Sequence, residues 1–109
     1  MGRKPEFSRE AVQVLACLPR APTAAVVSEI AQDVFQLDQT ASYAEHRAAC
    51  GKVRLALNEI RRHFRIYREY RPYDRHGRRV PWGQRERYGI ARDDWHHAQA
   101  AIQLGRKAT

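Results

Sequence analysis

Apolar residues recur every three or four positions in three stretches of the N-terminal half of the chain, a spacing that predicts amphipathic helices. The predicted helices span residues 8–18, 23–37 and 43–64. Ser8 and Thr23 are suited to cap the first two helices, because a hydroxyl oxygen there can accept a hydrogen bond from a free backbone amide. The apolar positions of these two helices include Ala11, Val12, Leu15, Leu18, Val26, Val27, Ile30, Val34 and Leu37.

The third predicted helix, residues 43–64, carries different chemistry on its different sides, and Thr40 or Ser42 is suited to cap it. Its apolar stripe consists of Ala49, Val53, Ala56, Leu57, Ile60 and Phe64. One flank of this stripe holds basic and amide groups without any acid, namely Arg47, Arg54, Asn58, Arg61 and Arg65. The other flank mixes signs. Leu55 lies nearly opposite the stripe and is either a single exposed leucine or the contact of a second element.

After residue 64 the period changes from helical to alternating, which predicts antiparallel strands over residues 65–71 and 84–90. The connection over 72–84 is a long hairpin tip in which Gly77 suits a positive φ. A final helix is expected over 93–105, with Trp95, Ala98, Ala101 and Ile102 on its apolar side.

The sequence therefore predicts a single domain of the α+β class, mainly α with a small antiparallel β-hairpin. Residues 8–92 form the domain, and the helix over 93–105 follows it. We expect residues 1–7 to be a flexible N-terminus and residues 106–109 to be a tail.

Positive charge is concentrated in one segment of the chain. The 109 residues carry a net charge of +8, with a pI of about 10.2. Residues 61–92 hold eleven arginines against Glu69, Asp74 and Glu86, which accounts for the whole net charge, because the charges of the remaining residues cancel. A charge that served solubility alone would be scattered over the surface. A pI above about 9 and a clustered charge favour a nucleic-acid partner.

The order of helices followed by a basic hairpin resembles a winged helix-turn-helix DNA-binding domain. The supporting helix would be VVSEIAQDVF, the turn QLDQTAS, the recognition helix YAEHRAACGKVRLALNEIRRHF and the wing RIYREYRPYDRHGRRVPWGQRERYGI. The resemblance implies that the third helix enters the major groove and that the wing reaches the adjacent backbone or minor groove. It covers roughly residues 8–92.

The candidate DNA contacts follow from the chemistry of arginine and asparagine, which can form bidentate pairs with guanine and adenine respectively. We expect Arg47 and Arg54 at base edges, Asn58 next to them, and Arg61 and Arg65 at phosphates. His46 and Lys52 lie off the basic flank and are weaker candidates. The wing candidates are Arg75, His76, Arg78 and Arg79, which surround Gly77. About six phosphate contacts predict a log-log salt slope of about −5.

Other classes of function find little support in the sequence. Cys17 and Cys50 lack ligand spacing, and the adjacent His96 and His97 diverge on a helix, so we expect no metal and no cofactor. Catalytic motifs are absent from the sequence, which argues against an enzyme. The sequence also lacks a signal peptide and any apolar run of membrane-spanning length, so we expect a cytoplasmic location and no membrane partner.

The leading hypothesis is a sequence-specific binder of double-stranded DNA, a small transcriptional regulator. One alternative is RNA binding, with exposed aromatic residues stacking on unpaired bases. The other is a protein-interaction module that docks an acidic partner on a winged-helix scaffold. A homodimer through the C-terminal helix is an equal alternative to the packing of Trp95 and Ile102 onto their own domain.

Overall fold

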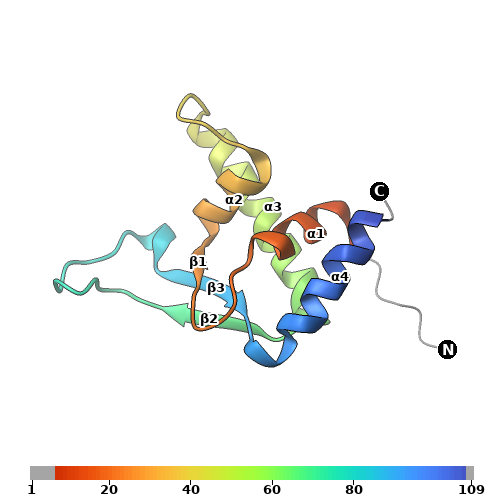
Figure 1. Cartoon of the computed structure of the whole chain (residues 1–109). Coiled ribbons are helices and arrows are strands. Elements are labelled where there is room, and N and C mark those ends of the chain that lie inside the picture. Colours follow the sequence, from red (N-terminus) through yellow and green to blue (C-terminus); the bar gives the residue numbers. More distant parts are fainter. Residues whose placement is uncertain (1–6, 108–109) are drawn as a thin grey trace.

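The computed structural model describes residues 7–107, which form four α-helices and a three-stranded antiparallel sheet (Figure 1). The mixed α+β class expected from the sequence is confirmed. Of residues 1–7, which were expected to be flexible, 1–6 lie outside the described residues, and Phe7 packs against the core with its ring stacked on Phe64. In chain order the elements are α1 (Arg9–Cys17), β1 (Ala25–Val26), α2 (Val27–Phe35), α3 (Tyr43–Arg61), β2 (Ile66–Tyr70), η1 (Trp82–Gln84), β3 (Glu86–Ile90), η2 (Arg92–Asp94) and α4 (Trp95–Lys107), where η denotes a single 3₁₀ turn.

Two serine caps start α1 and α3 as predicted. The Ser8 hydroxyl oxygen accepts a hydrogen bond from the Ala11 amide at 3.1 Å, and the Ser42 oxygen accepts one from the Glu45 amide at 3.1 Å. Ser8 also donates through its hydroxyl and its amide to one carboxylate oxygen of Glu59, at 3.0 and 3.2 Å. The start of α1 is thereby tied to α3, and the carboxylate nearest the end of α3 is engaged.

The second predicted helix is shorter than expected and begins later. Thr23 does not cap it, because Ala25 and Val26 form β1, and α2 starts at Val27 without a side-chain cap. The sequence AAVV continues a helical stripe, but pairing with β3 holds these residues extended. At its other end α2 stops at Phe35, because Gln36 takes a left-handed conformation with φ of 52°.

The ends of the other two helices also differ from the prediction. α3 ends at Arg61, and the chain then turns through residues 62–65 into β2 instead of continuing helical to Phe64. α4 continues through Lys107, so the expected tail starts later than residue 106. The 3₁₀ turn Arg92–Asp94 occupies the place where the helix was expected to begin.

The sheet has the strand order β1-β3-β2, with β3 in the centre. Arg68 of β2 lies opposite Tyr88 of β3, and Ala25 of β1 lies opposite Tyr88 from the other side. The loop after α1 crosses β3 at Gly89, where an added Cβ atom would lie 2.5 Å from the Thr23 carbonyl oxygen. Only glycine allows this approach of two backbones.

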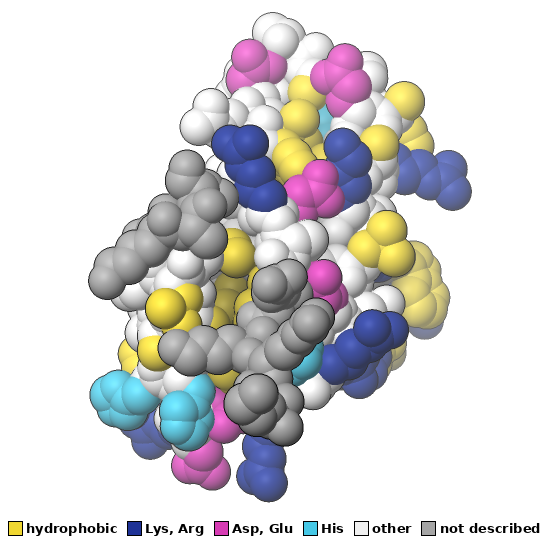
Figure 2. Space-filling model, turned by 90° about the vertical axis from the view of Figure 1, so that its right-hand side faces the viewer, with side chains coloured by type: hydrophobic (Ala, Val, Ile, Leu, Met, Phe, Trp, Pro, Cys, Tyr) yellow, Lys and Arg dark blue, Asp and Glu magenta, His cyan; other side chains and the backbone are white. Residues whose placement is uncertain are grey.

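α4 packs on α1, and Figure 2 looks onto this side of the molecule. Ala98 and Ile102 are buried against the domain, and an added Cβ at Gly105 would lie 2.7 Å from the Val12 side chain. The arrangement is the packing of the helix onto its own domain. Dimerisation through α4 stays a prediction. Ile102 is buried, so it is not an exposed apolar contact for a second copy. Basic groups stand apart on this face, with carboxylates between them (Figure 2).

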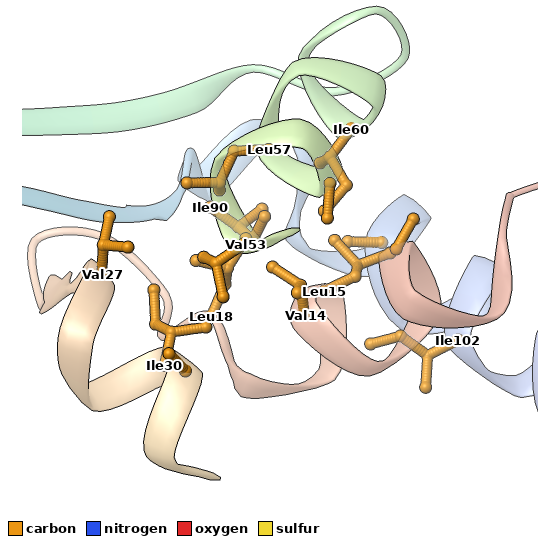
Figure 3. Close-up of a cluster of buried hydrophobic side chains, with 14 of the residues drawn as sticks. Val14, Leu15, Leu18, Val27, Ile30, Val53, Leu57, Ile60, Ile90 and Ile102 are labelled. Atoms are coloured by element: carbon orange, nitrogen blue, oxygen red, sulfur yellow. The ribbon is translucent and has the colours of Figure 1, made fainter. Parts of the chain in front are cut away.

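A single core joins the four helices and the central strand. The predicted stripe of α3 lies in it, since Ala49, Val53, Ala56, Leu57 and Ile60 are buried and Phe64 packs at its edge. Val53 and Leu57 belong to one cluster with side chains from α1, α2 and β3 (Figure 3). This packing fixes which side of α3 faces outward.

None of the helices in residues 7–107 combines the length and apolarity needed to cross a membrane.

Candidate nucleic-acid interface

The outward side of α3 carries the basic flank predicted from the sequence. Arg47, Arg54, Asn58 and Arg61 are all exposed, and residues 7–105 form no ion pair with any of these arginines. Opposite the buried stripe, Ala44, Ala48 and Leu55 are also exposed. On its outward side α3 therefore presents small, apolar and basic groups to solvent.

Three of the candidate residues from the helix are placed elsewhere. His46 is half-buried at the edge of the core stripe. The Lys52 ammonium lies 5.4 Å from the centre of the Phe35 ring, so it is directed toward α2. Arg65 follows the end of α3, and its backbone amide donates to the Asp94 carboxylate at 2.6 Å. The expectation that Arg65 continues the helical flank was wrong, because the helix stops four residues earlier.

The hairpin tip is an ordered turn built around Asp74. One Asp74 carboxylate oxygen accepts hydrogen bonds from the His76 amide at 2.8 Å and the Arg78 amide at 2.9 Å. Gly77 has φ of 76°, as its position in the sequence predicted. Because Asp74 is directed to backbone amides, it forms no ion pair with the arginines around it. The four candidates Arg75, His76, Arg78 and Arg79 are all exposed at this tip.

Below the tip, Arg85 is the structural residue that closes the loop over 72–84. Its side chain is buried, and its Nε donates to the Val80 carbonyl oxygen at 2.8 Å. The guanidinium carbon lies 3.8 Å from the centre of the Trp82 ring. A backbone hydrogen bond from Arg71 to Arg85 at 2.8 Å continues the ladder beyond the strands. This arginine holds the loop closed and does not face solvent.

A network of three side chains lies on the hairpin where it adjoins α3. Arg68 pairs with Glu86, and the Tyr88 hydroxyl donates to the other Glu86 oxygen at 2.6 Å. The hydrogen bond from Tyr88 and the charges of Arg68 and Arg54 hold the pKa of Glu86 below its ordinary value. Burial and the bond to Glu86 raise the pKa of Tyr88. The influence of Arg54 on Glu86 places the basic flank of α3 beside the hairpin.

This network was not among the sequence candidates. Arg68 and Glu86 are separated along the chain and become diagonal neighbours only through the strand register. Alignment of the two predicted strands by their alternating pattern could have identified this pair, since opposite charges on one face of paired strands stabilise each other. The hydrogen bond that Arg68 donates to Glu86 raises the pKa of Arg68, so this arginine stays charged.

Aromatic residues line the hairpin as well as the charges. The exposed fractions are 55% for Tyr70, 55% for Tyr73 and 79% for Trp82. One face of Trp82 is covered by Arg85, and most of the indole remains open to solvent. These rings offer flat surfaces beside the arginines of the tip.

Comparison with protein-family models, curated proteins and solved structures finds no match to this chain. In residues 7–107 no group of three or more histidine, cysteine, aspartate or glutamate side chains is arranged to hold a metal ion. The candidate interface therefore rests on its own geometry and charge.

Proposed function

We propose that the protein binds double-stranded DNA as a winged helix-turn-helix domain and acts as a small transcriptional regulator. α3 would lie in the major groove with Arg47, Arg54 and Asn58 toward the base edges. Arg61 would contact the flanking phosphate backbone. The hairpin tip would reach the adjacent backbone or minor groove through Arg75, His76, Arg78 and Arg79.

The observation that carries this proposal is the placement on α3 of arginines that have no ion pair within residues 7–105, near the base of a projecting basic hairpin. Arg54 lies close enough to Glu86 to lower its pKa, and Arg61 acts in the same direction on Tyr88. These two arginines of the flank therefore lie near the base of the hairpin, from which the tip projects (Figure 1). A polyanion can neutralise both at once, whereas the face over α1 and α4 mixes both signs (Figure 2).

The arrangement of the elements also supports the proposed fold. α2, the turn over residues 36–42 and α3 follow one another, and the hairpin of β2 and β3 comes next. β1 adds a third strand that ties the hairpin to the start of α2. In this arrangement the core side of α3 packs on α1 and α2, which leaves its basic side for a groove of DNA.

A fluorescence anisotropy titration with a labelled mixed-sequence duplex tests the proposal. The wild-type protein should bind at low salt and lose affinity with a log-log slope of about −5. The double variant Arg47→Ala/Arg54→Ala should bind about 30-fold more weakly at physiological salt, the loss expected for two released phosphate or base contacts.

The matched control is Arg9→Ala/Arg20→Ala, which removes the same charge from exposed positions on α1 and the loop after it. Its affinity should stay within about twofold of wild type, because distant charges are screened. Absence of duplex binding by micromolar wild-type protein at low salt would overturn the proposal.

RNA is the second candidate partner, and the exposed rings of Tyr70, Tyr73 and Trp82 favour it. Aromatic rings beside arginines can stack on unpaired bases. Competition between duplex DNA and single-stranded RNA separates the two. Preferential binding of RNA, together with quenching of tryptophan fluorescence, would replace DNA with RNA as the partner.

A further inference from the structure

Leu55 is a large apolar side chain on the outward side of α3, next to the basic flank that holds Arg54 and Asn58. It is 71% exposed, although apolar side chains of its size elsewhere in α3 are buried. Its neighbours one turn away on the outward side are Gly51 and Asn58. An added Cβ at Gly51 would have no atom of the described residues within 4 Å, so this part of the chain leaves the helix next to Leu55 uncovered.

Single exposed leucines are common on protein surfaces, so exposure alone assigns no role to Leu55. Its surroundings distinguish it from Leu104, which is 49% exposed and belongs to α4, the helix on the side of the molecule that mixes both charge signs (Figure 2). Leu55 lies about 100° around the helix from Arg54, an arginine that forms no ion pair with any of residues 7–105. A partner drawn to the arginines of α3 will therefore also meet this leucine.

The proposed function identifies what that partner offers to an apolar group, and the inference rests on it. In the major groove, base edges present hydrogen-bond donors and acceptors, and the C5-methyl group of thymine is the apolar feature. Asn58, three residues further along α3, can pair with adenine through its amide. We propose that Leu55 contacts a thymine methyl group, so that α3 reads target sites containing A·T pairs.

Replacement of thymine by deoxyuridine tests this contact, because it removes only the C5-methyl group. Duplexes are first selected from a random pool with the wild-type protein, and each thymine of a selected site is then replaced singly. One replacement should weaken wild-type binding about fourfold, the factor for one buried methyl group. Leu55→Ala should bind the thymine duplex about fourfold more weakly and should not distinguish it from the deoxyuridine duplex.

Leu104→Ala is the matched control and should keep the full sensitivity of the wild type to the methyl group. Leu55→Met should keep part of it, because methionine retains an apolar end of similar size. Thermal unfolding checks that each variant is folded, and alanine at an exposed helix position is well tolerated.

The outcomes separate this inference from the proposed function. If the wild-type protein binds duplex DNA but tolerates every deoxyuridine, the thymine contact is wrong while DNA binding stands. The same holds if Leu55→Ala keeps the discrimination, or if the selected sites contain no thymine. If no duplex binds at all, both proposals fail.

Discussion

The base and the tip of the hairpin contain similar numbers of arginines but use them in opposite ways. At the base, Arg68 and Arg71 form ion pairs with Glu86 and Glu69, and Arg85 is buried over Trp82. At the tip, the arginines stay exposed, because the nearby carboxylate of Asp74 accepts hydrogen bonds from backbone amides. The arginines at the base therefore stabilise the hairpin, whereas those at the tip give its surface a positive charge.

The comparison teaches that a count of arginines overstates the charge available to a partner. Residues 61–92 hold eleven arginines, but those paired with carboxylates contribute little long-range potential. What remains for a polyanion includes the tip and the outward side of α3, together with the exposed Arg62, Arg65 and Arg92. Substitutions at the base or at the tip can test this contrast. The following ones are ordered from the largest expected effect to the smallest.

Gly89→Ala should disrupt the base most strongly. The added Cβ would lie 2.5 Å from the Thr23 carbonyl oxygen and 2.9 Å from that of Pro19, and neither backbone can move without opening the sheet. We expect a loss of about 3 kcal/mol in the free energy of unfolding, measured by urea denaturation. Gly83→Ala is the control, since its Cβ meets nothing within 4 Å. Equal stability of both variants would contradict the close crossing at Gly89.

The triple variant Arg75→Ala/Arg78→Ala/Arg79→Ala should remove three positive charges from the tip and leave the base of the hairpin folded. Loss of three phosphate contacts predicts duplex binding about 100-fold weaker at physiological salt and a salt slope reduced by about 3. The control Arg9→Ala/Arg20→Ala/Arg92→Ala removes the same charge from other exposed positions. Anisotropy titrations over a range of salt concentrations measure both effects. An equal loss in the control would mean that only net charge matters.

Arg85→Ala should loosen the loop that joins the two regions. The change removes the hydrogen bond to the Val80 carbonyl and uncovers Trp82. We expect about 1 kcal/mol less stability and faster amide hydrogen exchange in residues 80–87. Arg85→Lys should not restore protection, because lysine lacks the planar stacking group. Unchanged exchange in the alanine variant would show that the loop is closed by other contacts.

Substitution of Glu86 in its network with Arg68 and Tyr88 should have the smallest effect on the free energy of unfolding, and this effect should depend on pH. Because its folded pKa is depressed, the stability that Glu86 contributes is present above its unfolded value, near 4.5, and is lost as the pH falls through the folded pKa. The difference in unfolding free energy between wild type and Glu86→Gln should be below about 1 kcal/mol, since the pair with Arg68 is largely exposed.

Urea denaturation at neutral and acidic pH measures this difference, which should shrink in acid. The raised pKa of Tyr88 has the opposite sign, so its contribution is lost only in strong alkali, as the pH rises through the folded value. The Tyr88→Phe variant isolates that part. A difference between wild type and Glu86→Gln that grows in acid would contradict the assigned pairing.

The sequence predicted those parts of the fold that depend on local periodicity. The core stripe of α3 and the caps at Ser8 and Ser42 are confirmed because helical spacing and capping are local properties. β1 was missed, since Ala25 and Val26 fit a helical stripe and only their pairing with β3 makes them a strand. Non-local pairing overrides propensity in such short segments.

The candidate interface was predictable to the same extent. The exposed arginines of α3 follow from the helical wheel, and the tip follows from its turn chemistry around Gly77. The placement of Lys52 over Phe35 and the Arg68–Glu86 pair depends on packing between elements that no local pattern contains.

Amide chemical shifts of the labelled protein, followed during titration with duplex DNA, test the central claim most directly. The account predicts that the changes concentrate on the outward positions of residues 44–62 and on the tip, residues 74–79. Residues of α1 and α4 should change little. Changes confined to α1 and α4, or no changes at low salt, would contradict the assignment of α3 and the hairpin tip as the DNA-binding surface.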